Sequence, residues 1–287
     1  MLEIREYRKV QDLEEAWELN QKKANRIIGG MMWLRMSRGK CGTAIDLSGL
    51  GLNEIGEKKD SFSIGCMVTL RQLECHVGLN EYTGGAVREA VRHIVGVQFR
   101  NLATVGGSIW GRFGFSDVLS IFLALDTEVE LYRGGRMPLS EFASRKPDRD
   151  ILVRLIVRKT PLRCIYQSVR NSRTDFPVLT CAVSRKADED AARIVIGARP
   201  GPAVIVPQPL SPDAPEMRQF LHFGINLRAS AEYREHLSGV LIRRALKQLG
   251  PENPEPEKPE LDKPELDKPE RKDHRTEWSG SLSSRWN

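Results

Sequence analysis

Two Gly-Gly pairs constrain this chain more than any other feature of its sequence. Gly29-Gly30 ends the stretch ANRIIGG, Gly106-Gly107 ends the stretch NLATVGG, and both pairs directly follow β-branched residues that favour a strand. Consecutive glycines let the backbone come within hydrogen-bonding distance of a ligand, and successive main-chain N–H groups in such a turn bind anions. One pair alone more often marks a tight turn or a bulge. Two pairs together favour a phosphate or pyrophosphate ligand, and we expect neither Gly106 nor Gly107 to tolerate a side chain.

The pairs do not belong to the commoner nucleotide-binding motifs. No Lys-Ser/Thr follows either pair, as a P-loop would require, and neither has the GxGxxG spacing of a dinucleotide-binding fold. The class of ligand therefore has to come from the rest of the chain.

Composition indicates an ordinary globular protein. The chain has 287 residues with 40% hydrophobic content, and no apolar run approaches the roughly 20 residues that span a bilayer. The start MLEIREYRKV is charged, unlike a signal peptide, so we expect a cytoplasmic protein without a membrane partner. The arginines are scattered and no basic run is interleaved with aromatics, so nucleic acid is not an expected partner, whereas an anionic small molecule suits the net charge of +6.

The five cysteines give no sign of a metal site. They are odd in number and show no CxxC spacing, which argues against a disulfide framework, a zinc site or an iron–sulfur cluster held by this chain. We expect no metal and interpret the cysteines as buried free thiols.

The pattern of apolar residues predicts an α+β body with an early parallel portion. Helices are expected after Asp12, across GAVREAVRHIVG (85–96) with Gly96 as its stop, over 118–125 behind Ser116, and from about Ser230 to Leu249. A capping box at Thr69 and Gln72 predicts a further short helix. Strands are expected at 26–28, 43–48, 61–68 and 127–132, and then from Ile151, Cys164 and Ala192 in a second, mostly antiparallel unit. From residue 251 the chain is rich in proline and charge, which predicts a disordered tail. Whether Trp278 and Trp286 in this tail form a docking motif stays open from the sequence alone.

Several stretches together resemble the FAD-binding subunit of the molybdenum hydroxylases, the family of xanthine dehydrogenase and carbon monoxide dehydrogenase. The strongest match is RNLATVGGS (100–108) with Ser116-Asp117 downstream, and IGGMM (28–32) is similar to the family's first glycine loop. Weaker agreement comes from SIGCMVTLRQL, SVRNSRTDFPVLTCAV and SAEYREHLSGVLIRRAL, so that the resemblance covers essentially residues 1–250.

The resemblance implies the fold and its domains. It implies a two-subdomain FAD-binding unit of the vanillyl-alcohol-oxidase or PCMH-like type over 1–160, with subdomains of about 1–58 and 59–160. A smaller α+β C-terminal domain would follow over 161–250, and the disordered tail would occupy 251–287.

The resemblance also implies a flavin site. FAD would lie extended between the two subdomains, with both glycine loops cradling its diphosphate, and no residue would be catalytic. Asp117 would lie near the flavin or its ribityl chain, although a first-turn helix carboxylate favoured by the dipole is the alternative. Leu152 and Gln167 would fall near the ring, where some relatives have a lysine in place of Gln167. The expected cofactor-binding residues are Ile27, Ile28, Gly29, Gly30, Met31, Met32, Trp33, Ala103, Thr104, Gly106, Gly107, Ser108, Ser116, Asp117, Leu152 and Gln167.

The chain departs from the family pattern at both loops. Met31 and Met32 replace polar and acidic side chains, and Ser108 replaces asparagine, which removes polar side-chain contacts to the ligand. Bulky residues also follow the second pair where the family has small residues and proline, namely Trp110, Arg112, Phe113 and Phe115. These changes would weaken FAD binding or reshape the flavin edge.

The leading hypothesis is an FAD-binding electron-transfer subunit. Its partners would be an iron–sulfur subunit and a molybdopterin-containing large subunit, with electrons passing from the iron–sulfur clusters through FAD to NAD or another acceptor. Two alternatives stay open, a non-catalytic scaffold with a degenerate flavin site and a free-standing FAD oxidase.

Overall fold

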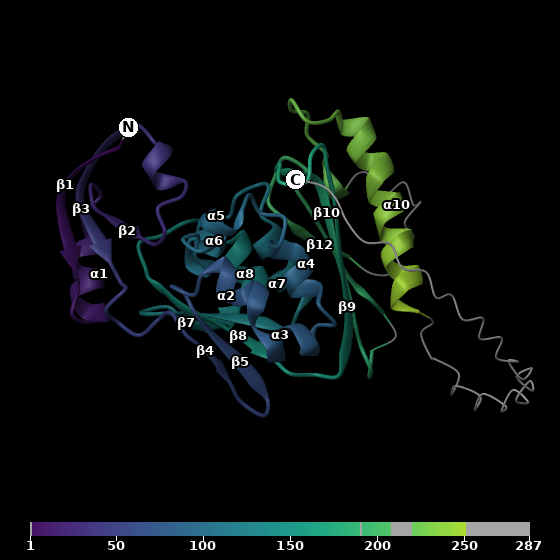
Figure 1. Ribbon diagram of the computed structural model, residues 1–287, viewed down its shortest axis with the longest axis horizontal. Coiled ribbons are helices and arrows are strands. Elements are labelled where there is room, and N and C mark those ends of the chain that lie inside the picture. Colours follow the sequence, from purple (N-terminus) through teal and green to yellow (C-terminus); the bar gives the residue numbers. More distant parts are fainter. Residues whose placement is uncertain (1, 190, 208–219, 251–287) are drawn as a thin grey trace, which may run out of the picture. The chain divides into compact units, whose positions relative to one another are not determined.

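The first sheet of the fold is parallel and lies at the start of the chain (Figure 1). The computed structural model describes residues 2–189, 191–207 and 220–250. Strands β1 (Leu2–Lys9), β3 (Gly39–Asp46) and β2 (Arg26–Ile28) pair in the order β1-β3-β2. Helix α1 (Leu13–Gln21) follows β1, and the Asp12 carboxylate caps it by accepting from the Glu15 N–H at 2.8 Å. The expected parallel portion is thus confirmed, with one strand more than the sequence pattern predicted.

The second sheet is antiparallel and has the strand order β4-β5-β8-β6-β7. Its strands are β4 (Ile55–Glu57), β5 (Ser61–Gly65), β8 (Leu152–Arg158), β6 (Thr127–Leu131) and β7 (Gly135–Pro138). Short helices occupy the long connection from β5 to β6: α2 (Leu70–Cys75), α3 (Val77–Tyr82), α4 (Ala86–Val91), α5 (Val97–Arg100), α6 (Val105–Trp110) and α7 (Asp117–Ala124). The 3₁₀ turn η1 (Leu34–Met36) follows β2, and α8 (Leu139–Ser144) joins β7 to β8.

Three of these helices test the sequence pattern directly. The capping box at Thr69 and Gln72 is present at the start of α2. Every residue of α7 is buried, as predicted for the stretch 118–125, which is apolar on nearly every side. The expected helix across 85–96 is wrong in its second half, because α4 ends at Val91, Val95 has a φ of +50°, and Gly96 caps the start of α5 instead of ending a helix.

The third sheet is antiparallel and carries a helix on each face. Its order is β12-β11-β10-β9, with β9 (Leu162–Arg170), β10 (Pro177–Lys186), β11 (Arg193–Gly197) and β12 (Val204–Val206). Helix α10 (Ala231–Leu249), capped by Ser230, lies along β9 and β10, and α7 contacts β10 and β11 (Figure 1). Strand β10 was not among the expected strands, because both of its faces are buried and its sequence does not alternate.

One hydrophobic core connects the three sheets. It includes Ile45 from the first sheet, Leu155 from the second and Tyr166 from the third, and a smaller core fills the space between β10 and α10. The described residues belong to one compact unit. The boundary expected near 160 falls between the second and third sheets, whereas the one expected near 58 falls between β4 and β5, which pair within the second sheet. The domain division stays a prediction. The tail expected at 251–287 lies outside the described residues.

Two further findings bear on the sequence expectations. Cys41, Cys66, Cys164 and Cys181 are buried free thiols as expected, whereas Cys75 is exposed. No helix in the described part of the chain is long and apolar enough to cross a bilayer.

Candidate functional site

A cavity of about 750 Å³ is lined by segments that belong to, or lie next to, each of the three sheets. Its wall is formed by residues between Asn20 and Leu34, by the stretch from Ile94 to Val118, by 148–152 and by 170–176. This volume lies within the range of small-molecule and cofactor sites. Among the expected site residues it is lined by Ile27, Ile28, Gly29, Gly30, Met31, Met32, Trp33, Ala103, Thr104, Gly106, Gly107, Ser108, Ser116, Asp117 and Leu152.

Gln167 is the one expected site residue that lies away from this cavity. Its side-chain Nε2 donates to Oε1 of Gln248 on α10 at 3.0 Å. Successive residues of a strand point to opposite faces of a sheet. Because the neighbouring Tyr166 faces α7, Gln167 faces α10 and cannot reach the cavity from β9.

The first glycine pair lies directly against the segment that leads into the second. A Cβ on Gly30 would stand 1.6 Å from the carbonyl oxygen of Leu102, and a Cβ on Gly29 would stand 2.5 Å from Oγ1 of Thr104. Only glycine permits so close an approach. The two glycine segments, far apart in sequence, therefore form one continuous stretch of cavity wall.

The first loop also presents unused hydrogen-bond donors. Within the described chain, the N–H groups of Gly30, Met31 and Met32 donate to no acceptor. Met31 holds a φ of +55°, a conformation that is sparsely populated for residues other than glycine and costs on the order of 1–3 kcal/mol. A strained turn of cavity-lining residues with consecutive free amides is suited to an anion.

The second glycine pair differs from the sequence expectation. It does not follow a strand as a loop, because Thr104 caps α6 and both glycines lie in the first turn of that helix. The Gly106 N–H donates to the Cys66 carbonyl at 2.8 Å, and the Gly107 N–H donates to Thr104 Oγ1 at 3.2 Å. These amides are therefore satisfied within the protein, unlike the N–H groups of Gly30, Met31 and Met32 in the first loop.

The two glycines of the second pair also differ from each other. A Cβ on Gly106 would stand 2.7 Å from the Cys66 carbonyl oxygen, so this glycine is required for internal packing and not for space in the cavity. A Cβ on Gly107 would meet only Thr104 Oγ1, at 3.2 Å. Since Gly107 lines the cavity, a side chain there would project into it.

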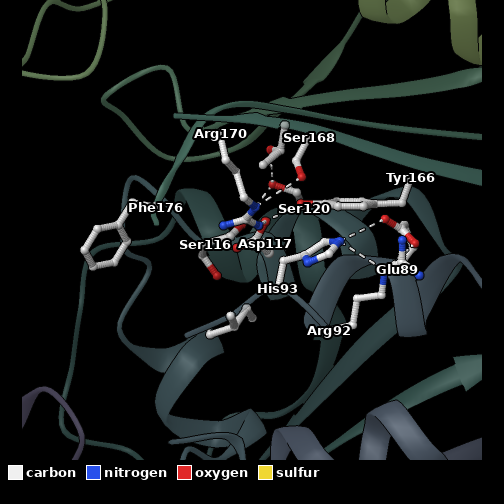
Figure 2. Close-up of polar contacts among 12 residues, drawn as sticks. Glu89, Arg92, His93, Ser116, Asp117, Ser120, Tyr166, Ser168, Arg170 and Phe176 are labelled. Atoms are coloured by element: carbon white, nitrogen blue, oxygen red, sulfur yellow. Dashed lines mark hydrogen bonds and ion pairs between the residues drawn. The ribbon is translucent and has the colours of Figure 1, made fainter. Parts of the chain in front are cut away.

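Asp117 connects the cavity to the third sheet through buried charges (Figure 2). Tyr166 Oη donates to Asp117 Oδ1 at 2.5 Å, and the Arg170 guanidinium forms an ion pair with the same oxygen. Burial raises the pKa of the Asp117 carboxyl to about 6, although the positive charge of Arg170 and the Tyr166 hydrogen bond lower it. Asp117 is the first residue of α7, so both sequence interpretations of its position are compatible with this contact.

Sequence reasoning missed three residues that line the cavity, Arg149, Arg170 and Phe176. The Arg149 guanidinium donates to the carbonyls of Asn20, Lys22 and Asn25 and so holds the chain on either side of the turn after α1. No local sequence signal marks Arg149, because its acceptors are backbone carbonyls more than a hundred residues away. Within the residues that the structure describes, no three His, Cys, Asp or Glu side chains gather in a metal-binding arrangement.

Comparison with known proteins agrees with this geometry. The family model described as the FAD binding domain in molybdopterin dehydrogenase matches residues 2–159. The uncharacterized protein YgfM of Escherichia coli (strain K12) is 25% identical over 249 residues, which cover 83% of this chain and 94% of YgfM.

Solved structures show the same fold. Quinoline 2-oxidoreductase from Pseudomonas putida 86 matches with a TM-score of 0.72 at 18% identity, covering 85% of this chain and 96% of that chain. A carbon monoxide dehydrogenase from Hydrogenophaga pseudoflava, in a form that lacks the Mo-pyranopterin moiety of its molybdenum cofactor, matches with a TM-score of 0.73 at 20% identity and the same coverage. Reconstituted CO dehydrogenase from Oligotropha carboxidovorans gives the same values.

Proposed function

Because this chain belongs to the family of FAD-binding domains in molybdopterin dehydrogenases, we propose that it binds FAD noncovalently in the cavity between its glycine segments. The observation that carries the proposal is that three consecutive residues lining a cavity of about 750 Å³, Gly30, Met31 and Met32, have N–H groups without an acceptor in the described chain. A diphosphate needs such donors, and backbone N–H groups do not depend on the side chains at Met31 and Met32. The residues present therefore fit the cofactor.

Each part of the wall has a role toward the ligand in this proposal. The first-loop amides hold the diphosphate, Gly107 leaves room beside it, and the apolar side chains of Ile28, Met32 and Leu152 exclude water. Asp117 is held in place by Arg170 on the third sheet. Bound FAD supplies one- and two-electron redox chemistry that amino-acid side chains lack. The chain itself binds, orients and shields.

We further propose that the protein is the electron-transfer subunit of a molybdenum-hydroxylase-type dehydrogenase. Its partners are an iron–sulfur subunit and a molybdopterin-containing large subunit, and its final acceptor is NAD or another oxidant. The support is the match to the family described as the FAD binding domain in molybdopterin dehydrogenase, together with the fold shared with carbon monoxide dehydrogenase and quinoline 2-oxidoreductase.

The test is to purify the protein from its native host with whatever remains bound to it, and to compare that complex with the isolated full chain. The complex is expected to oxidise a purine, an aldehyde or a related substrate, and the isolated chain is expected to oxidise none of them. Substrate-dependent turnover by the isolated chain would instead identify a free-standing oxidase. A complex that oxidises substrates while this subunit holds no FAD would favour the scaffold.

A further inference from the structure

Five aromatic rings that line the cavity pack against one another. The aromatic cluster consists of Trp33, Phe99, Phe113, Phe115 and Phe176. The Trp33 ring is central, with centroid distances of 5.3 Å to Phe176, 5.4 Å to Phe115, 6.0 Å to Phe113 and 6.1 Å to Phe99. Phe113 and Phe115 stack at 5.2 Å, and Phe115 lies 4.5 Å from Phe176.

The cluster is assembled from segments that are remote in sequence. Trp33 follows the first glycine pair, Phe113 and Phe115 lie between α6 and α7, and Phe176 immediately precedes β10. All five rings line the cavity, and none is fully buried. These side chains are partly exposed where they line the cavity, so they leave apolar surface available to a ligand.

Polar contacts behind the cluster hold its rings in place. The Arg228 guanidinium lies 4.8 Å from the Phe176 ring centroid and forms an ion pair with Asp175 at 2.8 Å. The Arg112 guanidinium lies 4.1 Å from the ring centroid of Phe142 on α8, which anchors the segment that carries Phe113 and Phe115. In Figure 2, Phe176 lies apart from the polar group around Asp117 and Arg170. The ring surface is thus fixed before a ligand arrives, which lowers the entropic cost of binding.

The chemistry of such a surface selects a planar ring system. Aromatic side chains stack with flat heteroaromatic rings in offset or tilted arrangements at the centroid distances seen within the cluster. An aliphatic chain would cover the rings without matching their flat faces. The free amides that suit a diphosphate lie within a few residues of Trp33 in the chain, so one ligand can use both.

We propose that the aromatic cluster is the stacking surface for one planar ring system of the bound dinucleotide, with Trp33 as its central ring. This inference rests on the proposed binding of FAD. The isoalloxazine and adenine ends of FAD share the required chemistry, and the experiment below distinguishes them. Stacking on these rings compensates for the absence of polar side chains at Met31 and Met32.

The test uses the full chain freed of flavin and titrated separately with FAD, FMN and ADP. Trp33→Leu and Phe115→Leu are expected to weaken FAD binding by about 5- to 150-fold, the range for loss of one ring stacked on a base. Trp17→Leu is the matched control, since Trp17 is half-buried beneath the Arg133 guanidinium at 4.9 Å and does not line the cavity. It should leave the affinity unchanged. Weaker binding of FMN but not ADP in the cluster variants assigns the isoalloxazine ring, and the reverse pattern assigns adenine.

Tryptophan emission gives a second readout that does not depend on the folding of the leucine variants. Trp33→Phe keeps a ring in the cluster and removes only the fluorophore, so the difference in emission between wild type and this variant reports Trp33. FAD is expected to quench this Trp33 emission, so the difference between the two proteins should decrease when FAD binds. Wild-type FAD affinity in both leucine variants, or unquenched Trp33 emission in the FAD complex, would overturn the stacking proposal. A wild-type chain that binds no FAD would instead contradict the proposed function itself.

Discussion

The adjacent glycines of α6 offer a sharp test, because the same substitution is expected to have opposite effects at neighbouring positions. Gly106→Ala places a methyl group 2.7 Å from the Cys66 carbonyl oxygen and 2.8 Å from the Cys66 Cβ. These distances are too short for contacts of a real Cβ, so the α6 segment has to shift. Gly107→Ala meets only the Thr104 hydroxyl oxygen, at 3.2 Å, and otherwise faces the cavity.

The expected magnitudes follow from packing and helix propensity. Overpacking costs about 1–3 kcal/mol, and weakening the hydrogen bond from Gly106 N–H to Cys66 adds about 1 kcal/mol. Alanine returns about 0.5–1 kcal/mol in a helix at either position. Gly106→Ala is therefore expected to lower the free energy of unfolding by roughly 1–3 kcal/mol, a fall in Tm of roughly 2–10 °C for a chain of this size. Gly107→Ala is expected to leave stability unchanged or slightly higher.

FAD binding should distinguish the two variants in the opposite way, because the substitution at Gly107 is the one expected to weaken it. Thermal unfolding of the flavin-free proteins measures the first effect, and titration with FAD measures the second. Gly107→Ala, and more strongly Gly107→Val, is expected to weaken FAD binding while the fold survives. If Gly107→Val bound FAD like wild type, or if Gly106→Ala were as stable as wild type, the assignment of one glycine to packing and the other to the cavity would be wrong.

Three further predictions concern single residues around the cavity. Thr104→Ala removes the side-chain cap of α6 and should destabilise the protein by about 1 kcal/mol in urea unfolding, with Thr104→Ser as the control that keeps the hydroxyl. Val95→Gly removes a β-branched residue from a backbone conformation with a φ of +50°. After the entropic cost of glycine, it should raise the free energy of unfolding by up to about 1 kcal/mol and so raise Tm. A lower Tm would show that Val95 is not strained. Because burial raises the pKa of Asp117 to about 6 from its usual 3.8, the folded protein binds this proton more tightly than the unfolded chain does, so the contribution of Asp117 to stability is greatest below about pH 4 and decreases as the pH rises to about 6. Asp117→Asn should abolish that decrease in unfolding free energies measured across this range, and an unchanged pH profile would contradict the raised pKa.

The sequence alone located the glycine segments but not the reason for each glycine. Pattern and turn chemistry are local, so they marked both glycine pairs as places where the backbone approaches a ligand, whereas Gly30 and Gly106 approach the protein's own backbone. The atoms approached are the carbonyl oxygens of Leu102 and Cys66, which only the tertiary structure brings close. The same limit explains why the second pair, expected in a loop, lies in a helix capped by Thr104.

Burial on both faces and remote partners account for the remaining differences. Strand β10 was not anticipated because α10 and α7 cover its two faces and remove the alternation that marks a half-exposed strand. The resemblance implied Gln167 near the flavin ring, but its side chain bonds to Gln248 on α10, on the face of β9 away from the cavity. The aromatic cluster was visible only as separate bulky residues, since Trp33 and Phe176 meet across the fold.

FAD titration of the purified full chain tests the central claim most directly. The account predicts uptake of one FAD per chain, with the yellow flavin released intact by heat or acid because it is held noncovalently by the amides of the first loop. A colourless protein that takes up no FAD at any concentration tried, while remaining folded, would contradict it.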